Sequence, residues 1–476
     1  MKLTKQSENF SQWYLDLVLM ADLADYAPVK GCMIIKPYGY KIWELIQKDM
    51  NERMEIMGVE NAYFPLLIPE DFIKKEAEHV DGFAPELLTA TRVGEKELEA
   101  PYVIRPTSET IIYDSYAKWI HSYRDLPMKM NQWANIIRWE KRTRPFLRTS
   151  EFLWQEGHTV HATENEADDM VMDALNMYDD FEQETLAFKG IKGKKSEAEK
   201  FPGAKYTTTL EVLAKDGKAI QSGTSHNLGQ GFSKAFNIQF TDTDEKMKHP
   251  WITSWGVSTR LIGSLIIVHG DDNGLRLPPN IAPIQVVIIP IAHDEIAKNS
   301  VMAEVDKISK SLKKEGLRVK IDSRDDKRPG FKFAEWELKG VPIRMEIGPK
   351  DLDKNQVICA RRDTSEKFPV NIPEVTDVIP ATLEDIHNSL LQESIDFTQQ
   401  NTTDVFDFEK FKEVIKEKGG FVRTAWCGEE QCEKKIQEKT KATSRCIPFE
   451  GQDAVKGECF HCGKDAKHIT LFAKAY

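Results

Sequence analysis

The sequence lacks any apolar run long enough to cross a membrane. A membrane helix needs about 20 consecutive apolar residues, whereas the longest apolar run here, VVIIPIA at residues 286–292, has the length of a strand. The first residues carry acids and a tryptophan within their apolar part, unlike the start of a signal peptide. We therefore expect a cytoplasmic protein, and its 476 residues should form about two to four domains.

The sequence also lacks an excess of positive charge and is poor in cysteine. Its formal net charge of −11 argues against non-specific binding of nucleic acid, although local basic patches remain possible. Seven cysteines are too few for a disulfide scaffold in a chain of this length. Five of the seven stand in the last 50 residues. This asymmetry points to a metal in one small domain.

Two close cysteine pairs, in CGEEQC and CFHC, can each bind one edge of a tetrahedral ion. Thiolates at this spacing suit zinc, and a site closed by four thiolates would be structural. The alternative is two incidental pairs of thiols, and Cys446, His461 and His468 are rival ligands. Cys446 lies in SRCIPFE, which has the pattern of a strand. The ligands that we predict are Cys427, Cys432, Cys459 and Cys462.

Neither GxxxxGK[ST] nor GxGxxG occurs, so a bound nucleotide would have to be held by arginines. RWEKRTRPFLR, residues 138–148, contains five cations and one carboxylate. Arg138 and Glu140 would share one face of a strand, KRTRP favours a turn, and FLRTSEFLWQEGH would return as a second strand. The pattern predicts an antiparallel pair with a basic loop at its tip, although a solvated basic hairpin without function has the same pattern.

The remaining chain has a recognisable order of elements. Residues 40–57 have the apolar spacing of a helix, and Arg260 begins a second, strongly apolar helix. The lysine-rich run at 192–203 is most simply a solvated loop. From about residue 283 to about residue 380, strands alternate with helices, which predicts a mostly parallel α/β domain.

Taken in order, these motifs resemble motifs one, two and three of the class II aminoacyl-tRNA synthetases. They are the helix at 40–57 followed by YFPLLIP, the RWE strand that returns through RTSEF, and a glycine followed by STR on a helix. Within that family the chain is most similar to the prolyl-tRNA synthetases, in their archaeal and eukaryotic-like form. The segments that carry this likeness are RPTSET, RWEKRTRPFLRTSEFLWQEGH, QSGTSHNLGQ, WGVSTRLIG and FAKAY.

The resemblance implies an α+β fold with three parts. These are a class II antiparallel sheet flanked by helices (residues 1–282), an α/β anticodon-binding domain (283–385) and a small α/β zinc-binding C-terminal domain (400–476). Only 62 residues separate His158 from Gln221, too few for an inserted editing domain. The helix at 40–57 would lie at a homodimer interface, although its apolar face suits an internal core equally well.

The resemblance also implies the reaction. L-proline would react with ATP, bound with Mg²⁺, to give prolyl-adenylate and pyrophosphate, and the prolyl group would then pass to the 3′ end of tRNA(Pro). Arg138 would be catalytic, because it would bridge the carboxylate and the α-phosphate. No side chain is an obvious general base for the transfer.

Three sets of residues follow from the resemblance. The ATP-binding residues would be Arg138, Glu140, Arg148, Thr149, Phe152, Gln221, Thr224, Ser258 and Arg260. The proline-binding residues would be Thr107, Glu109, Arg138, Trp154, Glu156, His158 and His226. The residues for the tRNA anticodon would be Glu337, Arg344 and Lys350.

Each assignment has a structural alternative. Trp154 could be a core residue of its strand, His158 and His226 could be structural histidines, and the three anticodon residues could be ordinary surface charges. For the whole chain, one alternative is a catalytically inactive synthetase-like protein that only binds tRNA. Another is a ligase that acts on a free amino acid without tRNA. The threonyl-, seryl- and glycyl-tRNA synthetases are the neighbours within the class.

Overall fold

The centre of the computed structural model, which describes residues 2–77, 87–292 and 294–476, is a sheet of eleven strands. Its order is β20-β21-β23-β22-β9-β10-β11-β14-β8-β7-β3. Within it, β3–β7 and β20–β21 are parallel pairs and the other pairs are antiparallel. The strands are β3 (Glu60–Asn61), β7 (Met128–Ile137), β8 (Glu151–His161), β9 (Ile191–Lys194), β10 (Tyr206–Leu213), β11 (Ala219–Gly229), β14 (Trp251–Ser258), β20 (Thr402–Asp404), β21 (Phe421–Trp426), β22 (Thr443–Pro448) and β23 (His468–Ala473).

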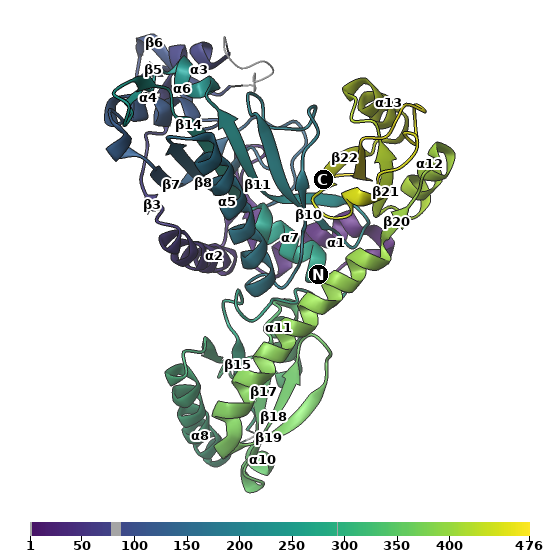
Figure 1. Cartoon of the computed structure of the whole chain (residues 1–476). Coiled ribbons are helices and arrows are strands. Elements are labelled where there is room, and N and C mark those ends of the chain that lie inside the picture. Colours follow the sequence, from purple (N-terminus) through teal and green to yellow (C-terminus); the bar gives the residue numbers. More distant parts are fainter. Residues whose placement is uncertain (1, 78–86, 293) are drawn as a thin grey trace.

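One side of this sheet is covered by long helices (Figure 1). They are α1 (Gln6–Met20), α2 (Pro37–Ile56), α5 (Glu164–Glu184) and α7 (Arg260–His269). The apolar side chains of these helices form one buried cluster with those of β10, β11 and β14. The helix predicted at 40–57 is confirmed, and it begins at Pro37 because proline suits the first turn of a helix. Its apolar residues Ile42, Ile46, Met50 and Met54 are buried within the chain itself.

Shorter elements lie beside the same sheet, and the two helices that carry Tyr113, Tyr116 and Phe232 belong to a second buried cluster. The helices are α3 (Glu70–Ala77), α4 (Glu109–Trp119), η1 (Tyr123–Asp125) and α6 (Gly231–Ala235). The strands are β1 (Ala24–Tyr26), β2 (Met33–Ile35), β4 (Leu67–Pro69), β5 (Thr89–Val93), β6 (Lys96–Ile104), β12 (Phe240–Thr241) and β13 (Met247–Lys248). Glu109 is the first residue of α4, so the RPTSET segment turns into a helix as expected.

A separate sheet of five strands, in the order β16-β15-β17-β18-β19, follows along the chain. The strands are β15 (Val286–Pro290), β16 (Val319–Ile321), β17 (Ile343–Ile347), β18 (Gln356–Arg361) and β19 (Lys367–Asn371), and the helices are α8 (Glu295–Lys314), α9 (Pro329–Leu338) and α10 (Pro349–Asp353). The α/β alternation is confirmed, and β15 pairs parallel with β16 and with β17, but the sheet is mixed rather than mostly parallel. Strands β17, β18 and β19 pair antiparallel, because their connections are too short for a parallel crossover.

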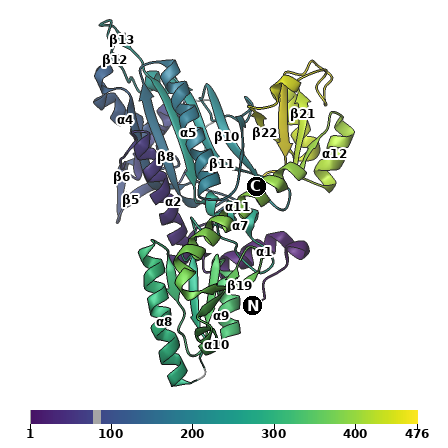
Figure 2. The ribbon, with the colours of Figure 1, turned by 60° about the horizontal axis from the view of Figure 1, so that its bottom comes forward.

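A long helix leads from this second sheet to the C-terminal strands (Figures 1 and 2). It is α11 (Val375–Gln400), preceded by η2 (Ile372–Glu374). Beyond it lie α12 (Phe408–Glu417), α13 (Glu430–Thr440) and η3 (Gln452–Ala454). Strand β22 pairs with β9 through Ile447 and Pro448, so the C-terminal strands extend the central sheet. In the described residues no helix is both long and apolar enough to span a membrane.

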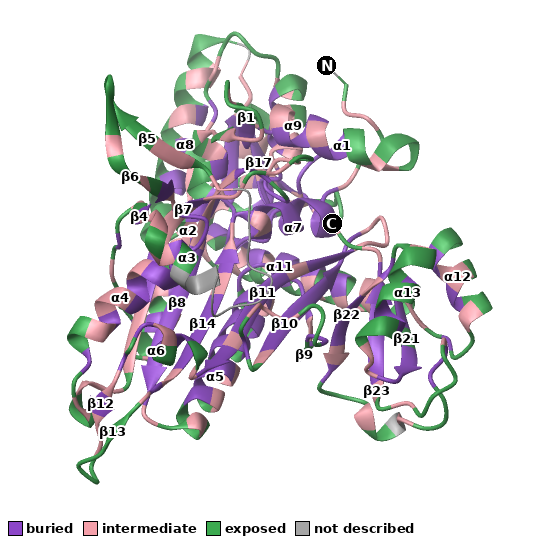
Figure 3. Ribbon diagram, turned by 90° about the horizontal axis from the view of Figure 1, so that it is seen from above, coloured by how far each residue is buried: buried purple, intermediate pink, exposed green. Residues whose placement is uncertain are grey.

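The lysine-rich run at 192–203 is not the solvated loop that its composition suggested. Its first residues form β9, and Lys195 and Ser196 are buried. The Lys195 ammonium donates to Glu211 at 2.7 Å and to the carbonyl of Arg445 at 2.9 Å. Figure 3 shows that β10, the strand paired with β9, is largely buried, whereas much of α12 is exposed. Lys195 is internal because its charge has partners, whereas Lys194, Glu197 and Glu199 of the same run are exposed, as predicted.

Candidate active site

A cavity of about 310 Å³ opens between β8, β11, β14 and the start of α7. Of the residues predicted for ATP or proline, Thr107, Glu109, Arg138, Phe152, Trp154, Glu156, His158, Gln221, Thr224, His226, Ser258 and Arg260 line it. Three predicted residues lie outside the lining. Glu140 forms an ion pair with Arg148 at 2.8 Å, and the Thr149 hydroxyl donates to the Glu151 carbonyl at 2.7 Å.

The predicted antiparallel pair is formed by β7 and β8, and Arg138 follows the last residue of β7. The backbone N–H of Arg138 donates to the Ser150 carbonyl at 2.8 Å, and its Nε donates to the Pro106 carbonyl at 2.8 Å. The guanidinium carbon lies 5.7 Å from the Phe152 ring centre and 5.4 Å from the Trp154 ring centre. These contacts fix the fork of Arg138 in the cavity before any ligand binds.

Two buried carboxylates face the same cavity. Glu156 accepts from Ser108 at 2.6 Å, from Gln132 at 2.8 Å, and shares a hydrogen bond with His158 at 2.9 Å. Glu109 accepts from the Thr107 hydroxyl. Only 3% of each glutamate is exposed. Two buried carboxylates next to a fixed guanidinium suit a small ligand that carries both a cation and a carboxylate.

The pKa values of the two histidines of the cavity are shifted in opposite directions. Burial favours neutral His158, but the hydrogen bond and charge of Glu156 outweigh it and raise the pKa of His158. Burial and the nearby His158 lower the pKa of His226 to about 3, so His226 is neutral at physiological pH. The Nδ1 of His226 lies 2.9 Å from the Thr207 hydroxyl, and its ring centre lies 4.8 Å from that of Phe201. His226 therefore offers an uncharged ring wall.

Part of the cavity lining is cationic and includes Arg138, Lys200 and Arg260. Arg260 begins α7, and its Nε donates to the Leu147 carbonyl at 3.1 Å. Burial, with the positive charges of Arg138 and Arg445, lowers the pKa of Arg260. Several confined cations make a site for a polyanion such as a triphosphate.

The sequence did not identify the segment that closes this cavity. Glu199, Lys200, Phe201 and Pro202 line it, although they belong to the lysine-rich run that was expected to be a loop in solvent. Nothing in their composition indicated this position. The one sequence signal that could have indicated it is the aromatic Phe201, followed by proline, directly after the charged residues.

A buried charge cluster lies behind the cavity wall. Glu211 accepts from Lys195 at 2.7 Å and from two nitrogens of Arg445 at 2.9 and 2.8 Å. Burial would raise the pKa of Glu211, but these two cations hold it below its ordinary value. Glu211 is paired in register with Gln221 of the cavity lining. The C-terminal strands are thus joined to the wall of the active site through Arg445.

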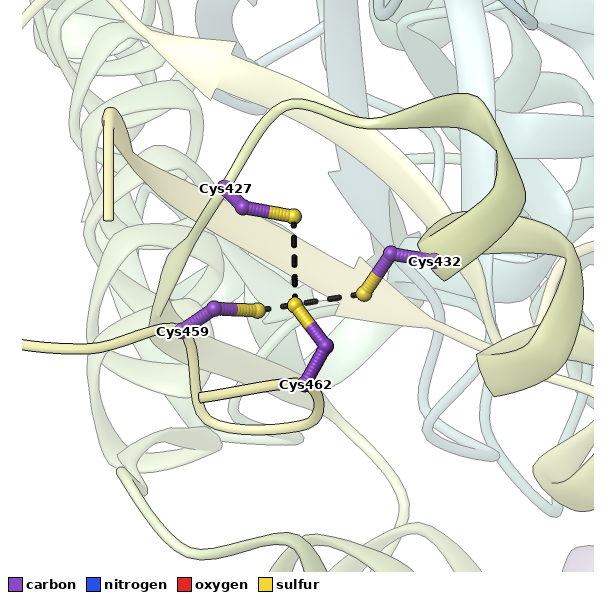
Figure 4. Close-up of side chains that lie close together, drawn as sticks. All are labelled: Cys427, Cys432, Cys459 and Cys462. Atoms are coloured by element: carbon purple, nitrogen blue, oxygen red, sulfur yellow. Dashed lines mark hydrogen bonds between the residues drawn. The ribbon is translucent and has the colours of Figure 1, made fainter. Parts of the chain in front are cut away.

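The structure brings the four predicted cysteines together, and their sulfur atoms all lie within 4.8 Å of one another (Figure 4). The Sγ atoms of Cys432 and Cys459 are 3.8 Å apart, and those of Cys462 and Cys427 are 3.6 Å apart. Sulfur atoms about 2.3 Å from a tetrahedral ion would be about 3.8 Å apart. The cluster could therefore hold a metal ion.

The three rival ligands occupy other positions. Cys446 is buried in β22, and the burial raises its pKa. His461 lies beside the cluster, with its Nδ1 3.3 Å from the Cys432 sulfur. His468 begins β23. Among the described residues, the four-sulfur group is the cluster of histidine, cysteine and carboxylate groups that is close enough to hold a metal.

A smaller cavity of about 230 Å³ lies between α9, β17 and β18. We call it the cationic pocket; its lining is Trp336, Glu337, Val341, Arg344, Ala360, Arg361, Arg362, Ser365 and Lys367. Glu337 and Arg344, both predicted for anticodon contact, lie here. Lys350 does not line the pocket and is exposed on α10.

Comparisons with known proteins agree with this arrangement. The family described as tRNA synthetase class II core domain (G, H, P, S and T) matches residues 92–269. The anticodon binding domain family matches residues 285–382, and the family of the prolyl-tRNA synthetase C-terminal part matches residues 408–476.

Full-length relatives are similar over the whole chain. A proline–tRNA ligase of Natranaerobius thermophilus is 50% identical, with 100% of this chain and 98% of the relative covered. A proline–tRNA ligase of Roseiflexus is 52% identical, with 100% and 99% covered. The crystal structure of prolyl-tRNA synthetase from Cryptosporidium parvum, complexed with halofuginone and AMPPNP, is 41% identical, covers 99% of each chain and has a TM-score of 0.95.

Proposed function

The chain belongs to the prolyl-tRNA synthetase family, and we propose that its own residues carry out that family's reaction. It is a ligase that activates L-proline with ATP and transfers the prolyl group to the 3′ end of tRNA(Pro). A catalytically inactive relative has no support, because Arg138, Arg148 and Arg260 are all present and full-length relatives are proline–tRNA ligases.

The observation that carries this proposal is one cavity whose lining combines two buried glutamates with Arg138 and Arg260. The secondary ammonium of proline would lie at Thr107 and Glu109. The flat walls would be Trp154, His158 and His226, and Glu156 would hold His158 in place. Each polar end of proline thereby meets a buried group of opposite charge.

ATP, taken as its Mg²⁺ complex, would extend toward Arg260. The adenine ring would stack on Phe152, and its amino group would donate to Glu140 once Arg148 leaves that carboxylate for a phosphate. Thr149, Gln221, Thr224 and Ser258 would contact the ribose and the phosphates. Arg138 would then lie between the proline carboxylate and the α-phosphate, where charge changes during the in-line displacement.

The activation step needs positioning rather than a covalent intermediate. A carboxylate oxygen of proline attacks the α-phosphorus, the bond to the β,γ-diphosphate breaks, and pyrophosphate leaves. Arg138 offsets the repulsion between the two anions, because its guanidinium can donate to both. We assign no side chain as general base in the transfer to the ribose hydroxyl of tRNA.

The test is amino-acid-dependent ATP–pyrophosphate exchange with each amino acid in turn. We expect exchange above background with proline. Absence of exchange with proline at saturating ATP contradicts the proposed function. A strong preference for threonine, serine or glycine would place the chain with a neighbouring specificity instead.

We further propose that tRNA binds through residues 283–385, with an anticodon nucleotide in the cationic pocket. Four cations line this pocket, and Glu337 can accept a hydrogen bond from a base edge. Lys350 would contact the tRNA backbone outside it. Residues 1–282 would form the catalytic domain and residues 400–476 the zinc-binding domain. The family matches at 92–269, 285–382 and 408–476 support this division.

A cytoplasmic homodimer is part of the same proposal. Because the apolar face of α2 is used inside the chain, a dimer must use other side chains. Large apolar side chains are exposed along the N-terminal part of the chain, and they are Tyr26, Val29, Ile34, Tyr40, Ile56, Tyr63, Leu67, Val93 and Tyr102. Exposed apolar groups in such number favour an interface with a second copy.

We propose that the four-cysteine cluster holds a structural zinc ion. Its donor set and its sulfur spacing fit zinc, and four protein ligands leave no open position. Cys432 lies in α13, and Cys459 follows β22 and η3, so the ion would join segments on either side of these elements.

Replacing Cys459 and Cys462 together by serine should remove zinc and lower the midpoint of thermal unfolding. Removing a structural metal deprives a small domain of binding free energy that is also folding free energy. The measurement is the metal content of the purified protein together with its melting curve. The matched control is Cys446→Ser, a buried thiol outside the cluster, which should keep the zinc. Unchanged zinc content in the double variant would contradict this site.

A further inference from the structure

The cationic pocket is attached directly to the catalytic part of the chain by one of its own lining residues. Arg362 is 6% exposed. Its Nη1 and Nη2 donate to the two carboxylate oxygens of Asp271 at 2.8 and 2.6 Å, and its Nε donates to the carbonyl of Glu337 at 2.9 Å. A planar guanidinium that is held on two edges has a fixed orientation. Any displacement of this fork must move Asp271, Glu337 or both.

Asp271 is itself a fixed point, because it lies two residues beyond the end of α7. Its carboxylate accepts from the backbone N–H groups of Asn273 at 2.9 Å and Gly274 at 3.0 Å, and its carbonyl accepts from the Trp13 indole at 2.9 Å. Burial would raise the pKa of Asp271, but Arg362 holds it below its ordinary value. The helix that ends here is the one that begins with Arg260 in the active site.

Backbone contacts reinforce the same connection. The N–H of Leu275 donates to the Leu338 carbonyl at 2.9 Å, and the N–H of Leu277 donates to the Gly340 carbonyl at 3.3 Å. At Gly274, with φ of +143°, a Cβ atom would lie 2.4 Å from the Cα of Leu338. This contact leaves no room for a side chain. The α9 wall of the pocket and the segment after α7 are therefore packed backbone against backbone, which transmits a shift rather than absorbing it.

We propose that Arg362 and Asp271 are positioning residues that couple a nucleotide in the cationic pocket to the placement of α7 and Arg260. The inference rests on the proposed function, which assigns an anticodon nucleotide to this pocket. Arg362 has five N–H donors, of which Asp271 and Glu337 take three. A base or phosphate acceptor in the pocket would accept hydrogen bonds from the same guanidinium and so change the ion pair between Arg362 and Asp271.

The coupling has a measurable consequence in both directions. If an anticodon ligand changes the affinity of the active site by some factor, an active-site ligand changes the affinity for the anticodon ligand by the same factor. Couplings between protein sites are commonly about 5- to 150-fold. We expect a factor of about 5 or more here, because the connection consists of one bidentate ion pair and several backbone contacts.

The experiment uses the full-length protein and two separate probes. One is the anticodon stem–loop RNA of tRNA(Pro), which has no acceptor end, and the other is a non-hydrolysable prolyl-adenylate analogue. The dissociation constant of each is measured alone and with the other at saturation. We expect the same factor of about 5 or more in both directions for the unchanged protein. A factor of one, with both probes bound, overturns the coupling and leaves the proposed function intact.

The decisive variant is Asp271→Asn. It removes the negative charge that pairs with Arg362 and changes no residue that lines either cavity. We expect its coupling factor to fall to within about twofold of one. The matched control is Arg276→Gln. Arg276 forms a similar bidentate pair with Glu393 of α11, at 2.9 and 2.7 Å, but does not line the cationic pocket. The control should keep the factor of the unchanged protein.

A second variant, Arg362→Lys, covers the case in which Asp271→Asn does not fold. It keeps the cation but loses the fork, so it should also lose most of the factor. If either folded variant keeps the full coupling factor, the inference is overturned. It is also overturned if Arg276→Gln loses as much of the coupling factor as these variants do. Failure of the stem–loop or of the analogue to bind the unchanged protein overturns the assignment of the corresponding site, and the coupling with it.

Discussion

Replacing Arg138 by alanine should lower proline-dependent ATP–pyrophosphate exchange by about 100-fold or more. Removing one buried donor that acts on charge in a transition state commonly costs about 3 kcal/mol. Arg138 fits that description, because Phe152, Trp154 and the Pro106 carbonyl already hold its guanidinium in the cavity. The loss should appear in kcat as well as in kcat/KM, since both reacting groups are anions that the guanidinium brings together.

The matched control for this variant is Arg142→Ala. Arg142 lies in the same basic segment but is exposed at the loop, so its loss should change the exchange rate by no more than about threefold in screened solvent. Binding of tRNA should survive in both variants, because the cationic pocket is unaffected. If Arg138→Ala loses tRNA binding together with exchange, the cause is misfolding. Near-normal exchange in Arg138→Ala would remove this residue from the catalytic step.

The sequence could predict the catalytic hairpin because two periodicities and a charge pattern agree there. The turn residues after Glu140 and the returning strand indicate one antiparallel pair, which β7 and β8 form. Strand β7 ends at Ile137, however, so Arg138 and Glu140 lie beyond it, and the prediction that they share one face of a strand is wrong. The position of Arg260 was equally predictable, since the pattern of turn residues followed by an apolar helix places it in the first turn of that helix. Local patterns are sufficient when neighbouring residues in the sequence are also neighbours in the site.

The buried start of the lysine-rich run at 192–203 could not be predicted, because the partners of its buried charge are distant in the sequence. Lys195 is buried only because Glu211, from the next strand, and Arg445, from the distant C-terminal part, meet it there. Composition alone assigns such a lysine to solvent. The same limit explains Arg362 and Asp271, whose ion pair joins positions 91 residues apart. Partners far apart in the sequence leave no periodic pattern in either segment.

The cysteine cluster, in contrast, could be predicted from the sequence. Its pairs are close in sequence, and the chemistry of thiolates restricts what four of them can do together. Spacing therefore predicted which four cysteines lie together, while the geometry was needed to separate them from Cys446, His461 and His468. The sulfur distances of 3.6 and 3.8 Å make that distinction.

Replacing Glu109 by glutamine should raise the KM for proline by about 10- to 100-fold and leave the KM for ATP nearly unchanged. A hydrogen bond to a buried charged group contributes about 1.5–3 kcal/mol. Glutamine preserves the size of the side chain and can still accept from Thr107, so the change removes mainly the negative charge that would meet the ammonium. The measurement is ATP–pyrophosphate exchange at varied proline and then at varied ATP, which separates the two ends of the cavity.

Glu199 supplies the matched control, because it lines the same cavity but is exposed to solvent. Glu199→Gln should change the KM for proline by no more than about threefold, since water and salt screen an exposed carboxylate. A larger effect at Glu199 than at Glu109 would indicate that the ammonium of proline binds near Glu199 instead. An equal rise in the KM for ATP in Glu109→Gln would mean that the whole cavity has been disturbed. Only a selective effect on proline fits a buried carboxylate that recognises a small cation while Arg138 holds the other end of the same molecule.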